Sequence, residues 1–278
     1  VVCSVLVSVL LKLARRFDID VSQAIAWNYV VASALTAAVL QPSLTTLREP
    51  AAPWLALAAL GILLPTIFLA LAASVRHAGI VRSDAAQRLS LLLSLLAAFA
   101  LFGERLTAPK GIGIALGLLA LLCMVWRSGQ GTPQRGAAGW LYPLLVFGGF
   151  GVIDILFKRV AQAGVPLGAS LQAMFALALL VAFALQLWRR TRGPTRFTLR
   201  SALAGLLLGL ANFGNILFYL RGHRALPQHP SLVFASMNLG VVALGALVGL
   251  LLFRERLSRL NLAGVALALL AIGVIARG

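Results

Sequence analysis

The residues of this chain that could do chemistry are few, and most of them lie inside long apolar stretches. Asp154 and Lys158 are four residues apart in one such stretch, so on a helix they share a face and can pair. A carboxylate placed there could bind a substrate amine or a proton, and the ammonium could hold a substrate carboxylate. The alternative is a self-neutralised pair that only stabilises its helix. Asp84 and Arg88 repeat this spacing nearer a helix end, where the structural interpretation is favoured.

Uncharged polar side chains form a second group of candidates. Gln87 and Asn238 lie inside apolar stretches 151 residues apart, and an amide can both donate and accept hydrogen bonds. They could bind the polar end of a zwitterion in a central cavity, or could only hydrogen-bond a neighbouring helix. Asn212, Asn215 and Tyr219 are spaced i, i+3 and i+7, which puts them on one stripe of a helix. Because a polar stripe should not face lipid, we expect these three to line a polar path through the protein.

Further polar candidates lie near the ends of the apolar stretches. His77, His223 and His229 could carry protons, because histidine titrates near neutral pH, but their positions favour solvated loop residues. His77 is kept as a candidate binding residue. Lys12 lies late in the first apolar stretch and could extend to a membrane surface. Neither the histidines nor the two cysteines have metal-ligand spacing, so no metal is expected.

The composition indicates the environment in which these residues lie. Of the 278 residues, 61% are hydrophobic and 11% are charged, and the mean hydropathy is +0.98. A soluble domain carries about 25% charged residues, so this chain cannot cover a soluble surface and is expected to be an integral membrane protein. The net charge of +17 comes mostly from arginines at the ends of apolar runs, where they would meet lipid headgroups rather than nucleic acid.

The apolar runs predict ten membrane-spanning helices, since one span needs about 20 apolar residues. The predicted spans are 1–16, 22–40, 53–76, 82–102, 108–126, 138–160, 168–188, 200–221, 229–253 and 259–276. All five tryptophans fall near span ends, which is typical of the membrane interface. The fold class expected is therefore an all-α integral membrane protein.

One segment of the sequence occurs twice. Phe102-Gly103-Glu104-Arg105-Leu106-Thr107 recurs 151 residues later as Phe253-Arg254-Glu255-Arg256-Leu257-Ser258. Each copy follows the fourth span of a five-span half, and because five is odd the second half must be inverted relative to the first. Two inverted five-helix repeats are typical of transporters, in which a binding site lies at the repeat interface.

A family resemblance rests on three features. They are these paired segments, the glycines that follow them at Gly113 and Gly264, and the lysines late in spans 1 and 6. The chain resembles the drug/metabolite transporter superfamily, namely its EamA-type ten-helix exporters, and within them is similar to the YddG amino-acid exporters. The resemblance implies a first repeat at 1–126, a linker at 127–137 and a second, inverted repeat at 138–278. Glu104 and Glu255 are interpreted as structural, because Thr107 and Ser258 can cap the helices that follow.

The resemblance implies a secondary transporter of the bacterial inner membrane that exports amino acids, aromatic or other neutral ones among them, and related small metabolites by alternating access. The alternative is a proton-coupled exporter of drugs or lipophilic cations. No enzyme activity, cofactor or nucleic-acid partner is expected, and the partners would be the small-molecule substrate and membrane lipids around a monomer. Basic residues are more frequent after spans 1, 3, 5, 7 and 9, which would place both termini outside, whereas the resemblance implies cytoplasmic termini and is followed here.

Overall fold

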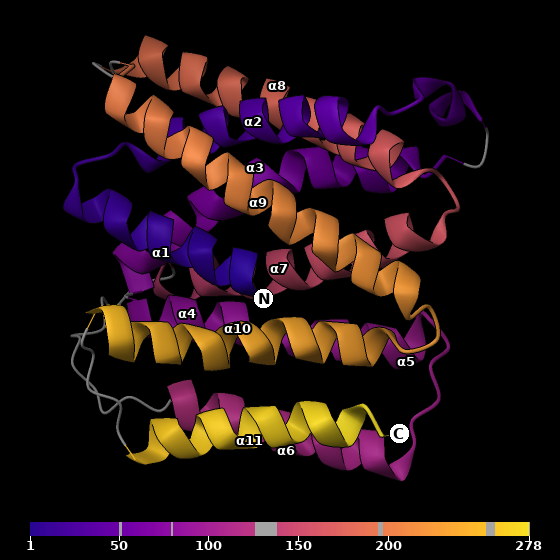
Figure 1. Cartoon of the computed structure of the whole chain (residues 1–278). Coiled ribbons are helices and arrows are strands. Elements are labelled where there is room, and N and C mark those ends of the chain that lie inside the picture. The colour runs from indigo at the N-terminus through magenta and orange to yellow at the C-terminus, as the bar shows by residue number, and fades with distance from the viewer. Residues whose placement is uncertain (50–51, 79, 126–137, 194–196, 254–258, 278) are drawn as a thin grey trace. The chain divides into compact units, whose positions relative to one another are not determined.

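The computed structural model describes residues 1–49, 52–78, 80–125, 138–193, 197–253 and 259–277. This described part is helical, and Figure 1 shows its helices in order along the chain. They are α1 (Val2–Arg16), α2 (Val21–Leu40), the 3-10 helix η1 (Leu44–Arg48), α3 (Trp54–Ala78), α4 (Ile80–Leu89), α5 (Leu91–Ala100), α6 (Ala108–Val125), α7 (Ala138–Gln162), α8 (Leu167–Arg192), α9 (Leu199–Ala225), α10 (Pro230–Phe253) and α11 (Arg259–Ile275).

The helices follow the predicted spans within a few residues at most ends. Six of them are long and apolar enough to cross a membrane: α2, most of α3 and α7, α8, α9 and α10. Shorter apolar helical segments cover Val2–Leu11, Ala86–Ala100, Ala108–Cys123 and Leu262–Ile275. The chain is therefore an all-helical protein with several potential membrane spans, and the count of ten spans stays a prediction.

The predicted span 82–102 differs from the structure, because it is divided into α4 and α5 at Ser90. The Ser90 hydroxyl donates a 2.6 Å hydrogen bond to the carbonyl oxygen of Gln87. A serine that bonds the preceding turn offers the backbone an alternative to the regular helical ladder and often bends the helix. Three leucines, Leu91 to Leu93, follow Ser90 directly, and their high hydropathy hides this interruption from a hydropathy pattern.

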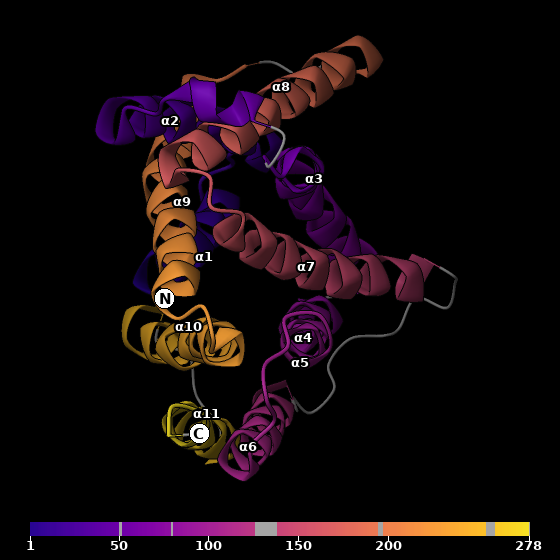
Figure 2. The ribbon, with the colours of Figure 1, turned by 90° about the vertical axis from the view of Figure 1, so that its right-hand side faces the viewer.

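The described helices form two compact units. The first combines Val1, 70–155 and 226–278. In it α6 packs along α11, which also contacts α10 (Figure 2). A Cβ at Gly113 would lie 2.5 Å from Ile275, and one at Gly117 would lie 3.7 Å from Ala271, so α6 and α11 run antiparallel with glycine at their closest approach.

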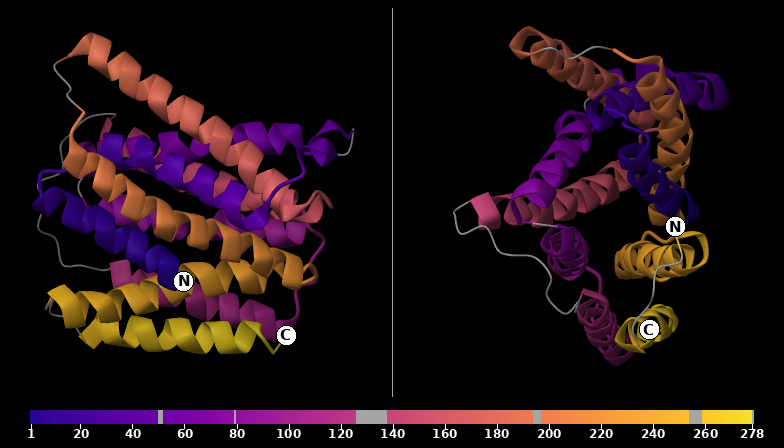
Figure 3. Two further views of the ribbon diagram at one scale, coloured as in Figure 1. Left: turned by 45° about the horizontal axis from the view of Figure 1, so that its top comes forward. Right: turned by 90° about the vertical axis from the view of Figure 1, so that its left-hand side faces the viewer.

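The second unit combines 2–69 and 156–225, and here α2 packs against both α8 and α9 while α1 packs on α9 (Figure 3). Helices α2 and α8 are antiparallel: Trp27 contacts Phe183 at 5.7 Å between ring centroids, whereas Leu40 lies against Gly168. Each compact unit thus draws on both predicted halves of the chain, so the sequence repeat is not the unit of packing. The division at 126 and 138 stays a prediction.

Candidate functional site

A buried basic cluster lies in the second unit, where the last turns of α7 pack against α9. Lys158 is completely buried, with 0% of its surface exposed, and His223 is 1% exposed. The ring of Tyr219 makes edge contacts with Phe157 at 5.8 Å and with His223 at 4.8 Å between centroids. Lys158 lies within electrostatic range of His223. Two basic side chains, Lys158 and His223, are therefore buried in a helical bundle together with the aromatic rings of Phe157 and Tyr219.

The expectation that His223 is a solvated loop residue is wrong. The predicted span ended at 221, but α9 continues to Ala225, and this additional turn carries His223 into the core. His229 does lie in a loop and is exposed. His77 is half-buried at the end of α3 in the first unit, with its ring stacked on that of Tyr142 at 5.0 Å.

The polar stripe of α9 is turned into the second unit. Asn212 and Tyr219 are buried, whereas Leu207 and Phe218 on other faces of the same helix are more than half exposed. The side-chain oxygen of Asn215 is buried and has no hydrogen-bond partner among the described residues. This oxygen is thus available to accept a hydrogen bond from a ligand or a water molecule.

The first unit holds a separate polar group at the interruption between α4 and α5. The hydroxyl of Ser94 donates a 2.7 Å hydrogen bond to the carboxylate of Asp154 on α7. Gln87 is half-buried one turn before Ser90, and Asn238 donates to the carbonyl of Phe234 in its own helix at 3.0 Å. The sequence gives no signal for the bond between Ser94 and Asp154, because a hydroxyl in an apolar helix can equally bond its own backbone.

A third group is a buried ion pair at helix ends of the first unit. Glu104 accepts hydrogen bonds from the backbone N–H of Ser231 at 2.7 Å and from its hydroxyl at 2.6 Å. Lys110 lies 3.1 Å from the Glu104 carboxylate and 3.4 Å from Nδ1 of His229. Thr107 accepts from the Lys110 N–H at 3.4 Å, as expected for a cap of α6. The carboxylate itself serves the first turn of α10, where the positive end of the helix dipole favours it.

Some sequence candidates fall outside this description. The side chains of Lys12 and Asp84 and the whole segment 254–258, with Glu255 and Ser258, lie outside the described residues. Among the described residues, no group of three or more His, Cys, Asp or Glu side chains could hold a metal ion.

Comparison with known proteins gives these clusters a context. Residues 1–126 match the EamA-like transporter family. An uncharacterized protein of Haemophilus influenzae is 43% identical over 280 residues, which cover 98% of this chain and 94% of that protein. A protein known from a crystal structure shares the fold with a TM-score of 0.72 and 20% identity, over 98% of this chain and 92% of that one.

The chain belongs to the EamA-like transporter family. It is therefore a multi-pass membrane transporter of the drug/metabolite transporter type, and members of this family are transporters rather than enzymes.

Proposed function

We propose that this transporter exports amino acids, aromatic or other neutral ones among them, and related small metabolites across the bacterial inner membrane by alternating access. Family membership supplies the transport activity and its small-molecule substrate. The narrower choice of substrate rests on the chemistry of the buried side chains in each unit.

The observation that carries this proposal is the burial of Lys158 beside Tyr219 and His223. A buried ammonium in a membrane bundle is costly, and such groups mark substrate or ion pathways. An amino-acid carboxylate complements the ammonium, and the phenol and imidazole can add hydrogen bonds to it. The rings of Phe157 and Tyr219, in edge contact at 5.8 Å, offer an apolar surface to a side chain of the substrate.

Two further polar groups are candidates for substrate binding, one in each unit. The carboxylate of Asp154, which Ser94 orients through its 2.7 Å hydrogen bond, could bind a substrate amine or a proton. Interrupted helices supply the binding groups of many secondary transporters, and the break at Ser90 lies one turn from Ser94. Asn212 and Asn215 supply uncharged donors and acceptors on α9. Coupling to a proton gradient or to the substrate gradient is compatible with these groups.

Alternating access is supported by the helix pairs. Helices α6 and α11 begin 151 residues apart, at Ala108 and Arg259, and they pack antiparallel. Helices α2 and α8 occupy corresponding places in the two halves and also pack antiparallel. Antiparallel pairs of corresponding helices are what an inverted repeat would produce, and the rocking of such repeats is the basis of alternating access.

The test is efflux from proteoliposomes loaded with a panel of labelled amino acids, with and without a pH gradient. We expect saturable efflux of several neutral amino acids. Asn212→Ala and Asn215→Ala should each reduce the rate severalfold while the protein stays folded, whereas Gln162→Ala, which removes an exposed amide at the end of α7, should leave it unchanged.

Absence of efflux for every amino acid, from protein shown to be folded, would overturn the proposed substrate class. The same vesicles would then be tested with quaternary ammonium dyes, because transport of these would support the alternative of a lipophilic-cation exporter. Unchanged efflux in both asparagine variants would remove the α9 stripe from the binding site.

A further inference from the structure

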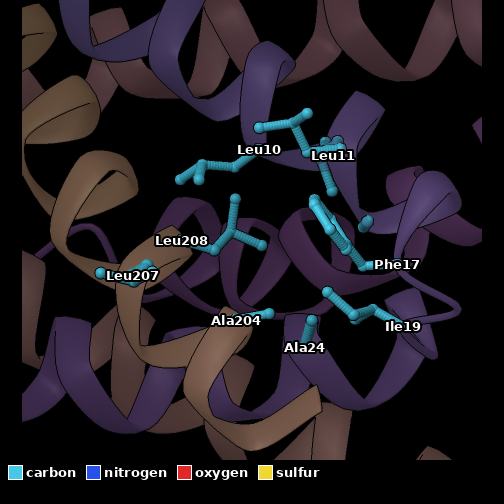
Figure 4. A pocket seen from close by; sticks show the side chains of 10 residues that line it. Leu10, Leu11, Phe17, Ile19, Ala24, Ala204, Leu207 and Leu208 are labelled. Carbon is cyan, nitrogen blue, oxygen red and sulfur yellow. The ribbon is translucent and has the colours of Figure 1, made fainter. Parts of the chain in front are cut away.

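The second unit contains an apolar pocket that none of the transport groups uses. Its volume is about 190 Å³, and carbon atoms make up nearly all of its wall. Figure 4 shows Leu10, Leu11 and Phe17 of the first helix and the turn after it on one side, with Ala204 and Leu208 of α9 and Ala24 of α2 completing the wall. An apolar cavity of about 150 Å³ stays dry and takes up a benzene-sized molecule, so this pocket fits a short stretch of hydrocarbon.

The pocket lies close to the level at which four helices of this unit end or begin. Asp20 caps α2 and lies 3.3 Å from Arg189 of α8. Its backbone N–H donates to Ser201, near the start of α9, at 3.1 Å. Nearby on α8, Arg192 lies over the exposed ring of Trp188 at 5.4 Å. Charged side chains with tryptophan at helix ends are typical of the membrane–water interface.

The depth of the pocket follows from the helix rise. Ala204 and Leu208 are three and seven residues beyond Ser201 on α9, which places them about 5–10 Å further along the helix axis. This is the depth at which the acyl chains of a phospholipid begin. The pocket wall therefore lies where hydrocarbon, and not water, is the solvent.

The pocket is open toward an apolar surface. Phe17 and Leu207 at its rim are 58% and 56% exposed. Leu203 and Leu210 continue this exposed face of α9 on either side of Leu207. In a membrane-spanning helix an exposed apolar face meets lipid, so hydrocarbon can enter sideways.

We propose that an acyl chain of a membrane phospholipid occupies this pocket. The exposed guanidinium of Arg192, at the end of α8 where the helices of this unit begin or end, suits an anionic headgroup at the same level. The bound chain would fill the space between α1 and α9, next to the buried contact of Val7 with Leu208 and Ala211. The lipid would thus be a structural ligand of the second unit, and it is distinct from the transported substrate.

The experiment uses vesicles of phosphatidylethanolamine and phosphatidylglycerol that contain a phosphatidylglycerol with a photoreactive diazirine in one acyl chain. After irradiation, labelled peptides of the full-length protein are mapped by mass spectrometry. We expect labelling concentrated in residues 10–17 and 204–208. Ala204→Phe fills the pocket and should cause a severalfold loss of this labelling, with Ala204→Leu as the milder replacement. The matched control is Ala184→Phe on an exposed position of α8, which should leave the labelling unchanged.

Two results would overturn the proposal. One is labelling that is spread over the exposed leucines of all helices and is unaffected by either substitution at Ala204 in folded protein. The other is labelling of the pocket by a diazirine-bearing fatty alcohol in the same vesicles without labelling by the phospholipid. Neither readout depends on transport, so a failed efflux assay would leave the lipid site standing.

Discussion

The two units bury charged side chains in different ways. In the first unit, Glu104 and Lys110 form a pair with side chains 1% and 5% exposed, and the carboxylate also accepts both hydrogens that Ser231 offers. In the second unit, Lys158 and His223 are buried together with Tyr219, whose ring contacts that of His223.

If the proposed function is correct, the first cluster is structural and the second binds the substrate. The Glu104 cluster balances one negative against one positive charge and satisfies the first turn of α10, so its groups are occupied in holding helix ends together. In the proposed function, the Lys158 cluster and its aromatic rings bind the carboxylate and the apolar side chain of the substrate. Removal of groups from the first cluster should affect stability, and removal from the second should affect transport.

The largest effect is expected for Glu104→Ala. This change leaves the ammonium of Lys110 buried without its carboxylate and removes the acceptor of two Ser231 hydrogen bonds. Loss of one member of a buried pair costs about 3–5 kcal/mol. We expect a large loss of folded protein and a lower midpoint in thermal unfolding of the detergent-solubilised transporter.

The double variant Glu104→Gln with Lys110→Met sharpens this prediction. It removes both charges together and should recover part of the stability that each single substitution loses. A Glu104→Ala protein as stable as the original would show that the pair does not hold the helix ends, and would remove the contrast between the two units.

The positions of the helices could be read from the sequence, whereas their partners could not. Spans are bounded by charges and tryptophans, which a hydropathy pattern detects directly, and α6 begins at Ala108 as predicted. The partner of Glu104 is Ser231, 127 residues away, and such long-range contacts leave no local signal. The sequence predicted a structural role for Glu104 beside the helix that follows it, whereas the structure shows its carboxylate also bonded to the first turn of α10.

In the candidate site, too, the sequence predicts which face of a helix is polar but not which residues of other helices it contacts. Asn212, Asn215 and Tyr219 could be predicted to avoid lipid because their spacing defines one helical face. The burial of His223 was not predicted, because hydropathy falls at Arg221 although the helix continues for another turn. Ser94 was missed because a hydroxyl in an apolar helix most often bonds its own backbone, and only the approach of α7 gives it Asp154 as a partner.

Lys158→Met tests whether the buried cluster of the second unit binds the substrate. It replaces the buried ammonium by an apolar side chain of similar length, so the protein should stay folded while efflux of amino acids falls by at least about tenfold, equivalent to about 1.4 kcal/mol. Arg221→Met, which removes an exposed charge from α9, should transport normally. A Lys158→Met protein with normal efflux and KM would exclude the ammonium from substrate binding.

A smaller effect is expected for Ser94→Ala. The hydroxyl orients the carboxylate of Asp154 through a 2.7 Å hydrogen bond, and a hydrogen bond to a charged group contributes about 1.5–3 kcal/mol at most sites. We expect a severalfold rise in the KM for efflux with little change in the maximal rate. Ser236→Ala, on α10 of the same unit, is the control, and equal behaviour of the two variants would contradict a role for Asp154 in binding.

The smallest effect is expected for Arg189→Ala. This substitution removes a partly exposed ion pair, which can be compared with the buried pair of Glu104 and Lys110. Arg189 and Asp20 lie 3.3 Å apart in the second unit, but their side chains are 33% and 28% exposed, so solvent screens the pair. Exposed pairs contribute about 0–1 kcal/mol, and Asp20 keeps its role as cap of α2, where it accepts from the Ser22 N–H at 2.9 Å. Thermal unfolding of Arg189→Ala should therefore resemble that of the original protein, whereas Asp20→Ala should lose about 1 kcal/mol through the cap. If Arg189→Ala instead destabilised the protein as strongly as Glu104→Ala, charge pairing itself, and not the burial of the pair, would be what distinguishes the structural clusters of this transporter.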